Sequence, residues 1–249
     1  MLALLDSVRA QNGEPVRIVV VGNGCHLTGL GPDVETAELQ ENLGVSGGRN
    51  IAPEPDTFAR LRKAMTPPDV GIVSFRIADE TGFTQRRHVP RLRASDPMLA
   101  GEVTTFLGGG HAIRAEVFEQ VGAWPTEFFF AHEETDLAWR AIDAGWRVRY
   151  EPELLLQHPR TSPARHEVYF RMNARNRVWL AKRHLPALLV PVYLVVWTVL
   201  MLVRRPPLAG LKAWLTGFAE GVRTPCGRRK PMRWRTVVRL ARLGRPPVI

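Results

Sequence analysis

An acidic cluster at the start of a predicted helix follows an aromatic run, and together they could perform chemistry. The cluster is Glu133, Glu134 and Asp136, and the residues before it are Phe128–Phe130 and His132. A carboxylate placed here could act as a general base on an acceptor hydroxyl, with Phe130 and His132 beside the acceptor. The alternative is structural, because acids also stabilise a helix N-terminus, and Asp136 is spaced to pair with Arg140.

Three glycine-containing loops could let a nucleotide sugar approach the backbone. Gly22 and Asn23 follow the apolar run 16–21, and ligands bind at the carboxyl ends of such strands in open α/β sheets. Arg49 and Asn50 follow two glycines and offer a fixed positive charge and an amide to a diphosphate. Gly109 and Gly110 precede another predicted helix. The first and third of these loops are equally explained as tight turns.

The elements that would position these residues alternate between strands and helices. Gly122 and Gly145 follow two of the predicted helices, as residues that end a helix often do. The predicted helices are 2–11, 54–65, 112–121 and 134–144, and the predicted strands are 16–21, 70–75, 147–150 and 154–157. This order predicts an α/β domain over residues 1–180, with the run 16–21 as a buried parallel strand.

His158 and the two cysteines give little evidence for a metal site. His158 follows a predicted strand and is either a metal ligand or a structural histidine. Cys25 and Cys226 lie far apart and form no Cys-x-x-Cys pair, which argues against a zinc site or a disulfide framework.

Positive charge is concentrated in the last part of the chain. Residues 1–203 carry 22 Lys and Arg against 23 Asp and Glu, whereas residues 204–249 carry 12 against one. The uncharged run 185–203 is long enough to cross a bilayer, but one crossing would leave the basic tail on the unfavoured side. We therefore expect residues 181–249 to form an extension with an in-plane or re-entrant helix.

The basic residues of this extension would then lie on anionic headgroups. Leu211, Trp214, Leu215 and Phe218 are spaced for a second interfacial helix. The alternative for the run 185–203 is a C-terminal helix packed on the domain core. Nucleic acid is not an expected partner, because no base-reading motif accompanies the charge.

Taken together, these segments resemble family-2 glycosyltransferases of the GT-A fold, including bacterial rhamnosyltransferase-like enzymes. The matching segments are 18–24, 41–50, 68–75, 79–82, 108–124, 128–140, 145–152 and 158. The resemblance implies a GT-A-like (Rossmann-like) mixed sheet flanked by helices, with a membrane-associated helical extension. It also implies inverting transfer of a sugar from a nucleotide-diphosphate sugar to a hydroxyl of a polysaccharide, glycolipid or cell-envelope glycan. The acceptor would be a glycan or lipid-linked, and the protein would lie on the cytoplasmic side of the cell membrane.

The resemblance also implies roles for single residues. Glu134 matches the catalytic base and Glu133 the acid before it. The donor site would contain Gly22, Asn23, Arg49, Asn50, Gly109 and Gly110. His158 matches a histidine that helps to hold Mg²⁺ or Mn²⁺ in some members.

Two features depart from the family pattern. The chain begins at the family's first helix, and it passes from Asn50 to Pro53 without the segment that carries the Asp-x-Asp metal motif. The second interpretation is therefore a catalytically inactive remnant that binds a membrane or a partner. A third is a nucleotidyltransferase on the same fold, against which the acid-fronted helix argues.

Overall fold

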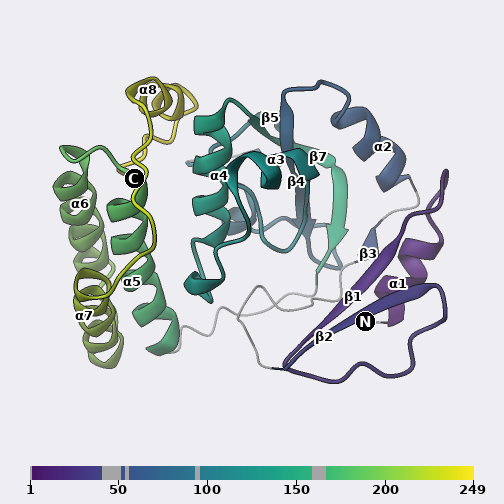
Figure 1. The fold of residues 1–249 in the computed structure, drawn as a ribbon, viewed down its shortest axis with the longest axis horizontal. Coiled ribbons are helices and arrows are strands. Elements are labelled where there is room, and N and C mark those ends of the chain that lie inside the picture. The colour runs from purple at the N-terminus through teal and green to yellow at the C-terminus, as the bar shows by residue number, and fades with distance from the viewer. Residues whose placement is uncertain (1, 41–51, 54–55, 93–95, 159–166) are drawn as a thin grey trace.

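The structure, a computed structural model, describes residues 2–40, 52–53, 56–92, 96–158 and 167–249. Its centre is a mixed sheet flanked by helices, which confirms the expected α/β class (Figure 1). Arg49, Asn50 and the rest of the matching segment 41–50 lie outside the described residues.

The main sheet has five strands in the order β3-β7-β4-β6, with β5 also pairing with β7. Its strands are β3 (Ala52–Pro53), β4 (Val70–Ala78), β5 (Gly101–Glu102), β6 (His111–Ile113) and β7 (Arg147–Gln157). The two long strands β4 and β7 are parallel, whereas β6 is antiparallel to β4 and β3 and β5 are antiparallel to β7. The carboxyl ends of β4 and β7 therefore lie at the same edge of the sheet.

Strand β4 is a continuous apolar run because both of its faces are covered. Ile72 enters a core shared with α3 (Ala115–Val121) and α4 (Glu133–Ala144). Val73 and Phe75 enter a second core, against Leu61 on α2 (Thr57–Ala64) and the adjoining Met65.

Several of the predicted element boundaries change. The helix expected at 112–121 begins only at Ala115, because Ala112 and Ile113 pair with β4 as part of β6. The strands expected at 147–150 and 154–157 are one strand, β7, whose register against β4 shifts midway. The helix expected at 54–65 is described from Thr57 to Ala64.

The run 16–21 was expected to form a buried strand. A strand does form there, but the prediction that it is buried is wrong. Strand β1 (Ile18–Asn23) pairs in parallel with β2 (Val34–Leu39), in a two-stranded sheet separate from the main one. The side chains of Val19 and Val21 are 49% and 53% exposed. Figure 1 shows this pair at the end of the molecule opposite the C-terminal helices, beside α1 (Leu2–Arg9). A β-branched run favours a strand, but only a covering layer can bury it.

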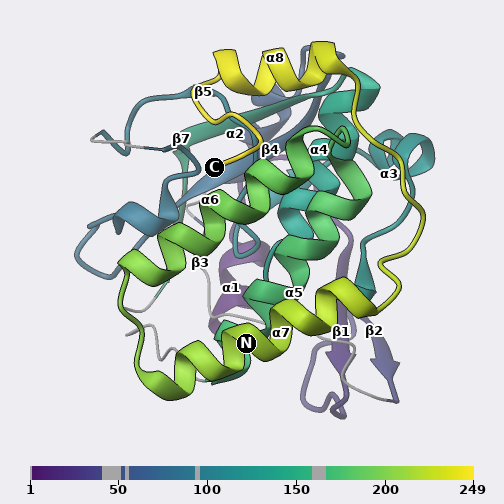
Figure 2. The ribbon, with the colours of Figure 1, turned by 90° about the vertical axis from the view of Figure 1, so that its left-hand side faces the viewer.

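The C-terminal half of the chain adds four helices on the other side. They are α5 (Glu167–His184), α6 (Leu189–Val203), α7 (Leu208–Arg223) and α8 (Trp234–Arg242). Helices α5, α6 and α7 lie side by side, and α8 crosses the top of the domain (Figure 2). Trp179 of α5 and Leu240 of α8 are buried in the same core as Ile72 and Leu137, so one core joins residues on both sides of position 180.

The uncharged run 185–203 forms a turn followed by the 15-residue helix α6. Among the helices that the structure describes, none is both long and apolar enough to cross a membrane. Trp214, predicted to lie at a membrane interface, is buried with Phe170, Ala174 and Met201. That part of α7 therefore packs on α5. Tyr193 of α6 enters the main core, as the alternative for the run 185–203 supposed.

Candidate functional site

The acidic helix α4 begins beside the main sheet and after an unusual loop. It runs from Glu133 to Ala144, and Gly145, with φ of 114°, ends it in the left-handed conformation expected from the sequence. The residue before the helix, His132, is also left-handed, with φ of 75°. This backbone directs the first turn of α4 toward the loop that precedes β6.

The Glu134 carboxylate lies directly against that loop. A methyl group built on Gly108 would lie 1.9 Å from Glu134 Oε1, so only glycine leaves room for the carboxylate in this position. The loop is a tight turn, because the Gly110 amide donates to the Leu107 carbonyl at 3.1 Å. The structure therefore brings Glu134 together with the segment that contains Gly109 and Gly110.

Glu133 is the more buried of the two glutamates. The residue is only 4% exposed, and its Oε2 accepts no hydrogen bond among the described residues. Burial raises the pKa of the Glu133 carboxyl, and a backbone hydrogen bond opposes that shift. A buried carboxylate without full hydrogen bonding is costly, so Glu133 is not explained by helix capping alone.

Asp136, by contrast, belongs to a structural ion-pair network. Its carboxylate lies 2.8 Å from Arg140 Nε, 2.5 Å from His184 Nε2 and 3.3 Å from Arg183 Nε. Arg140 also donates to the carbonyls that end α3, including Val121 O at 2.6 Å. The structural alternative therefore holds for Asp136, although the pair with Arg140 is buried rather than on the surface.

The loop before α4 has a strained backbone. Phe129, Ala131 and His132 have positive φ values of 58°, 67° and 75°, which cost non-glycine residues free energy. Two polar side chains of α5 hold this loop. Asn176 Nδ2 donates to the carbonyls of Phe128, Phe130 and Ala131 at 2.7–2.9 Å, and Arg175 donates to Phe128 O at 3.0 Å.

This clamp of Arg175 and Asn176 was not predicted from the sequence. Both side chains are buried, but no signal in the sequence indicates this, because they stand among other polar residues of α5 such as Asn173 and Arg177. Because the carbonyls they contact lie more than 40 residues earlier, no local pattern shows the contact. We infer that the clamp fixes the position from which Glu133 and Glu134 project.

Replacing Asn176 with Ala should loosen the loop without removing a carboxylate. We expect a loss of about 2 kcal/mol in the free energy of unfolding, because buried carbonyls lose their donors. The measurement is urea denaturation. Asn12→Ala is the matched control, because Asn12 bonds Asp56 at the surface, and it should change stability by less than about 0.5 kcal/mol. Equal losses in both variants would contradict the clamp.

The two predicted acceptor residues border a second group of side chains on α5. His132 Nε2 donates to Asn173 Oδ1 at 3.0 Å, and the Phe130 ring packs edge-on against Tyr169. Burial lowers the pKa of His132 well below its ordinary value, and the charges of Arg177 and Arg245 act in the same direction. His132 is therefore a neutral imidazole at neutral pH.

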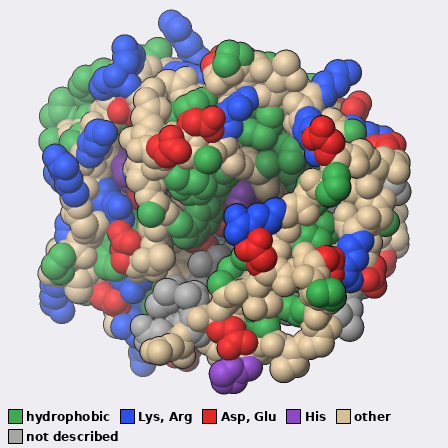
Figure 3. All heavy atoms as spheres, turned by 45° about the vertical axis from the view of Figure 1, so that its right-hand side comes forward, with side chains coloured by type: hydrophobic (Ala, Val, Ile, Leu, Met, Phe, Trp, Pro, Cys, Tyr) green, Lys and Arg blue, Asp and Glu red, His purple; other side chains and the backbone are tan. Residues whose placement is uncertain are grey.

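The predicted donor residues are distributed over several places. Gly109 and Gly110 directly follow Gly108, which contacts Glu134. Gly22 and Asn23 lie at the end of β1, in the separate two-stranded sheet. In the space-filling view of Figure 3, one face of the molecule is hollowed, with hydrophobic side chains on its walls and charged ones around its rim.

The carboxyl ends of β4 and β7 carry the residues nearest to a metal site. Asp79 follows β4, but one of its oxygens already accepts hydrogen bonds from Thr81 and Phe83. His158 follows β7, and its ring lies 6.4 Å from that of His88. Within the described ranges, no three His, Cys, Asp or Glu side chains come together as metal ligands. The described residues therefore offer no complete set of ligands for Mg²⁺ or Mn²⁺.

Comparison with known proteins agrees with this architecture. A family model described as glycosyl transferase family group 2 matches residues 52–219, which is more than half of the chain. That range includes β4, the glycine loop, α4 and the clamp on α5. A comparison with curated protein sequences finds no match.

Several solved structures resemble this chain at low identity, and the first described here shows the same fold. S. aureus TarS 1-349 in complex with UDP-GlcNAc has a TM-score of 0.55 at 11% identity, over 88% of this chain and 76% of that one. Mannosyltransferase PcManGT from Pyrobaculum calidifontis, in complex with GDP-Man and Mn²⁺, has a TM-score of 0.49 at 16% identity, over 96% and 79%. A longer S. aureus TarS structure has a TM-score of 0.47 at 13% identity over 71% of this chain, which spans only 37% of that protein.

Proposed function

Because the chain belongs to glycosyl transferase family group 2, we propose that it transfers a sugar from a nucleotide-diphosphate sugar to a hydroxyl acceptor. The carrying observation is the Glu134 carboxylate, held against the glycine loop at the start of α4. In this proposal Glu134 removes the proton of the acceptor hydroxyl. The hydroxyl oxygen then attacks the anomeric carbon while the bond from that carbon to the diphosphate oxygen breaks. The nucleoside diphosphate leaves, and the configuration at the anomeric carbon is inverted.

The other residues of the site support this single displacement. The buried Glu133 and the neutral His132 would surround the acceptor, with Phe130 as an apolar wall. Gly109 would border the donor sugar, because its lack of a side chain lets a ligand approach the backbone. Gly110 remains a predicted donor contact. Gly22, Asn23, Arg49 and Asn50 remain predicted donor contacts.

A nucleotide panel tests the proposal directly. The purified chain is mixed with UDP-, GDP- and dTDP-sugars, with and without Mg²⁺ or Mn²⁺, and nucleotide binding and slow sugar hydrolysis are followed. Saturable binding of one nucleotide class, with release of its diphosphate, supports the transferase. Neither binding nor release under any condition would favour the catalytically inactive remnant instead.

Replacing Gly108 with Ala should displace Glu134 and leave the fold intact. The new methyl group would meet the mobile end of the Glu134 side chain, which can move away. We expect transfer to fall at least tenfold, since a misplacement of about 1 Å can cost a hundredfold, with little change in unfolding by urea. Gly110→Ala is the contrast, because its methyl group would meet Leu156 in the core at 2.6 Å and should lower stability. Full activity in Gly108→Ala would contradict the assigned position of Glu134.

The same proposal places the protein on the cytoplasmic face of a membrane through residues 185–249. The support is an apolar stripe on α6, where Val192, Val195, Val199 and Leu202 are exposed at helical spacing. The flanking basic residues suit anionic headgroups. The acceptor would be a glycan or a lipid-linked hydroxyl, such as those of the cell envelope.

A further inference from the structure

A pocket of about 220 Å³ lies between α5, α6 and α7, behind the turn that joins α6 to α7. Its walls include Asn173 and Arg177 of α5, Trp197 of α6, and Arg204 at the end of α6. The volume is several times that of a water molecule, about 30 Å³, and leaves room for a small polar group. None of the described residues assigned to sugar transfer lines this pocket.

Positive charge gathers in and beside the pocket. The Arg177 guanidinium lies 3.2 Å from the centre of the Trp197 ring, and that of Arg204 lies 5.8 Å from the same centre. Burial lowers the pKa of Arg177, and the charge of Arg204 contributes in the same direction. Burial likewise lowers the pKa of Arg245, as does the charge of Arg177. Arg177 is thus close enough to Arg204 and to Arg245 to be repelled by each of them.

These arginines have no acidic partner within the part of the chain that the structure describes. The polar partner of the Arg177 side chain is the Tyr193 hydroxyl, at 3.3 Å. By contrast, Arg171 and Arg175 on the same helix both pair with Glu220. A desolvated guanidinium without a counter-ion is costly, and a phosphate matches its hydrogen-bonding geometry.

The mouth of the pocket is apolar as well as basic. Leu202 and Val203 before the α6–α7 turn, and Leu208 after it, are 55%, 71% and 69% exposed. Arg204 and Arg205 lie between them and are also exposed. Exposed aliphatic side chains beside arginines suit the boundary between lipid chains and headgroups. This combination favours a phosphate attached to a lipid over a free anion.

We propose that this pocket binds the phosphate group of a lipid, with Arg177 and Arg204 as its ligands. The lipid chain would leave along the exposed residues of the α6–α7 turn. Asn173 lines the pocket and accepts a hydrogen bond from His132, which directly precedes Glu133 and Glu134. A lipid held here would therefore border the acceptor site. That this lipid is the acceptor rests on the proposed function, whereas the phosphate site itself does not.

Binding to vesicles tests the site without any sugar donor. One set contains phosphatidylcholine with phosphatidic acid, and the other contains phosphatidylcholine with oleic acid at the same measured surface charge. We expect binding to the phosphatidic acid set to be at least tenfold tighter. Arg177→Met and Arg204→Met should each weaken it by about tenfold or more, as expected for a lost charge-assisted hydrogen bond.

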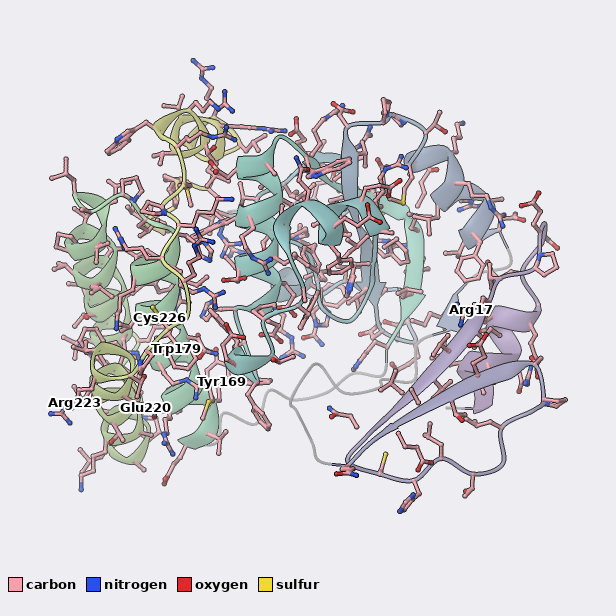
Figure 4. All side chains as sticks on the ribbon, in the orientation of Figure 1. Arg17, Tyr169, Trp179, Glu220, Arg223 and Cys226 are labelled. Atoms are coloured by element: carbon pink, nitrogen blue, oxygen red, sulfur yellow. The ribbon has the colours of Figure 1, made fainter. Side chains whose placement is uncertain are left out.

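Arg223→Met is the matched control. Arg223 is an exposed arginine of α7, and Figure 4 shows it at the outer edge of the helical layer, away from the main sheet. Its replacement should weaken binding to the two vesicle sets equally and leave the preference for phosphatidic acid unchanged, because an exposed arginine of the extension contributes only general attraction to anionic lipid. A loss equal to that of Arg204→Met would overturn the site in favour of general attraction between the basic tail and the membrane.

Three further outcomes decide the proposal. Equal binding to the two vesicle sets would overturn phosphate recognition. Inorganic phosphate that binds as tightly as the phosphatidic acid vesicles would overturn the lipid source. If Arg177→Met does not fold, Arg204→Met decides alone, because Arg204 is exposed at the mouth. A nucleotide panel without any transfer would leave these vesicle results standing, so failure of the site and failure of the transferase are distinguishable.

Discussion

Glu134→Gln is expected to lower sugar transfer by about a hundredfold to ten-thousandfold while leaving the fold unchanged. Glutamine keeps the shape that fits against Gly108, but its amide cannot accept the proton of the acceptor hydroxyl. The measurement is the turnover rate with the nucleotide sugar that the panel identifies. Unfolding by urea is compared in parallel, to separate lost chemistry from lost structure.

Two further variants make this test specific. Glu116→Gln changes an exposed glutamate in the first turn of α3 and should leave the rate within about twofold of the original. Glu133→Gln asks whether the buried neighbour is the base instead. Full activity in Glu134→Gln would remove Glu134 from this role, and loss confined to Glu133→Gln would transfer the role to Glu133.

Asp136→Asn should reduce the free energy of unfolding by about 3 kcal/mol or more, because it breaks a buried ion-pair network. Asp136 is fully buried and faces Arg140, Arg183 and His184, so the change leaves two guanidinium groups without their counter-ion. Urea denaturation at neutral pH measures the loss. Asp69→Asn removes a mostly exposed pair with Arg147 and should cost less than about 1 kcal/mol.

The pH dependence of this difference has a defined sign. Burial opposes ionisation of Asp136, but the hydrogen bond from His184 and the charges of His184, Arg140 and Arg183 lower the pKa of its carboxyl overall. The network therefore stabilises the fold fully above the ordinary pKa of an aspartate, about 3.9. The advantage over Asp136→Asn should shrink as the pH falls below that value toward the folded pKa. A difference that stayed constant down to pH 2 would contradict this assignment.

Helices and strands that depend on neighbouring residues in the chain could be predicted from the sequence alone. The apolar run of β4 and the acids and Gly145 that bound α4 each act through neighbours in the chain, by sterics and backbone hydrogen bonding. The order of these elements indicated the α/β class, and the residues of the matching segments carried the resemblance to the family. The acid-rich start of the helix was also predicted, with Glu133 and Glu134 in it.

The burial of each surface and the partner of each charged side chain could be seen only in the folded chain. The tertiary structure left β1 exposed, buried Trp214 against α5, and showed that Asp136 is structural. It also brought Asn176 to a loop 45 residues earlier and left Arg177 without an acidic partner among the described residues. Burial and long-range pairing are properties of the packed chain, because they depend on contacts between segments far apart in the sequence.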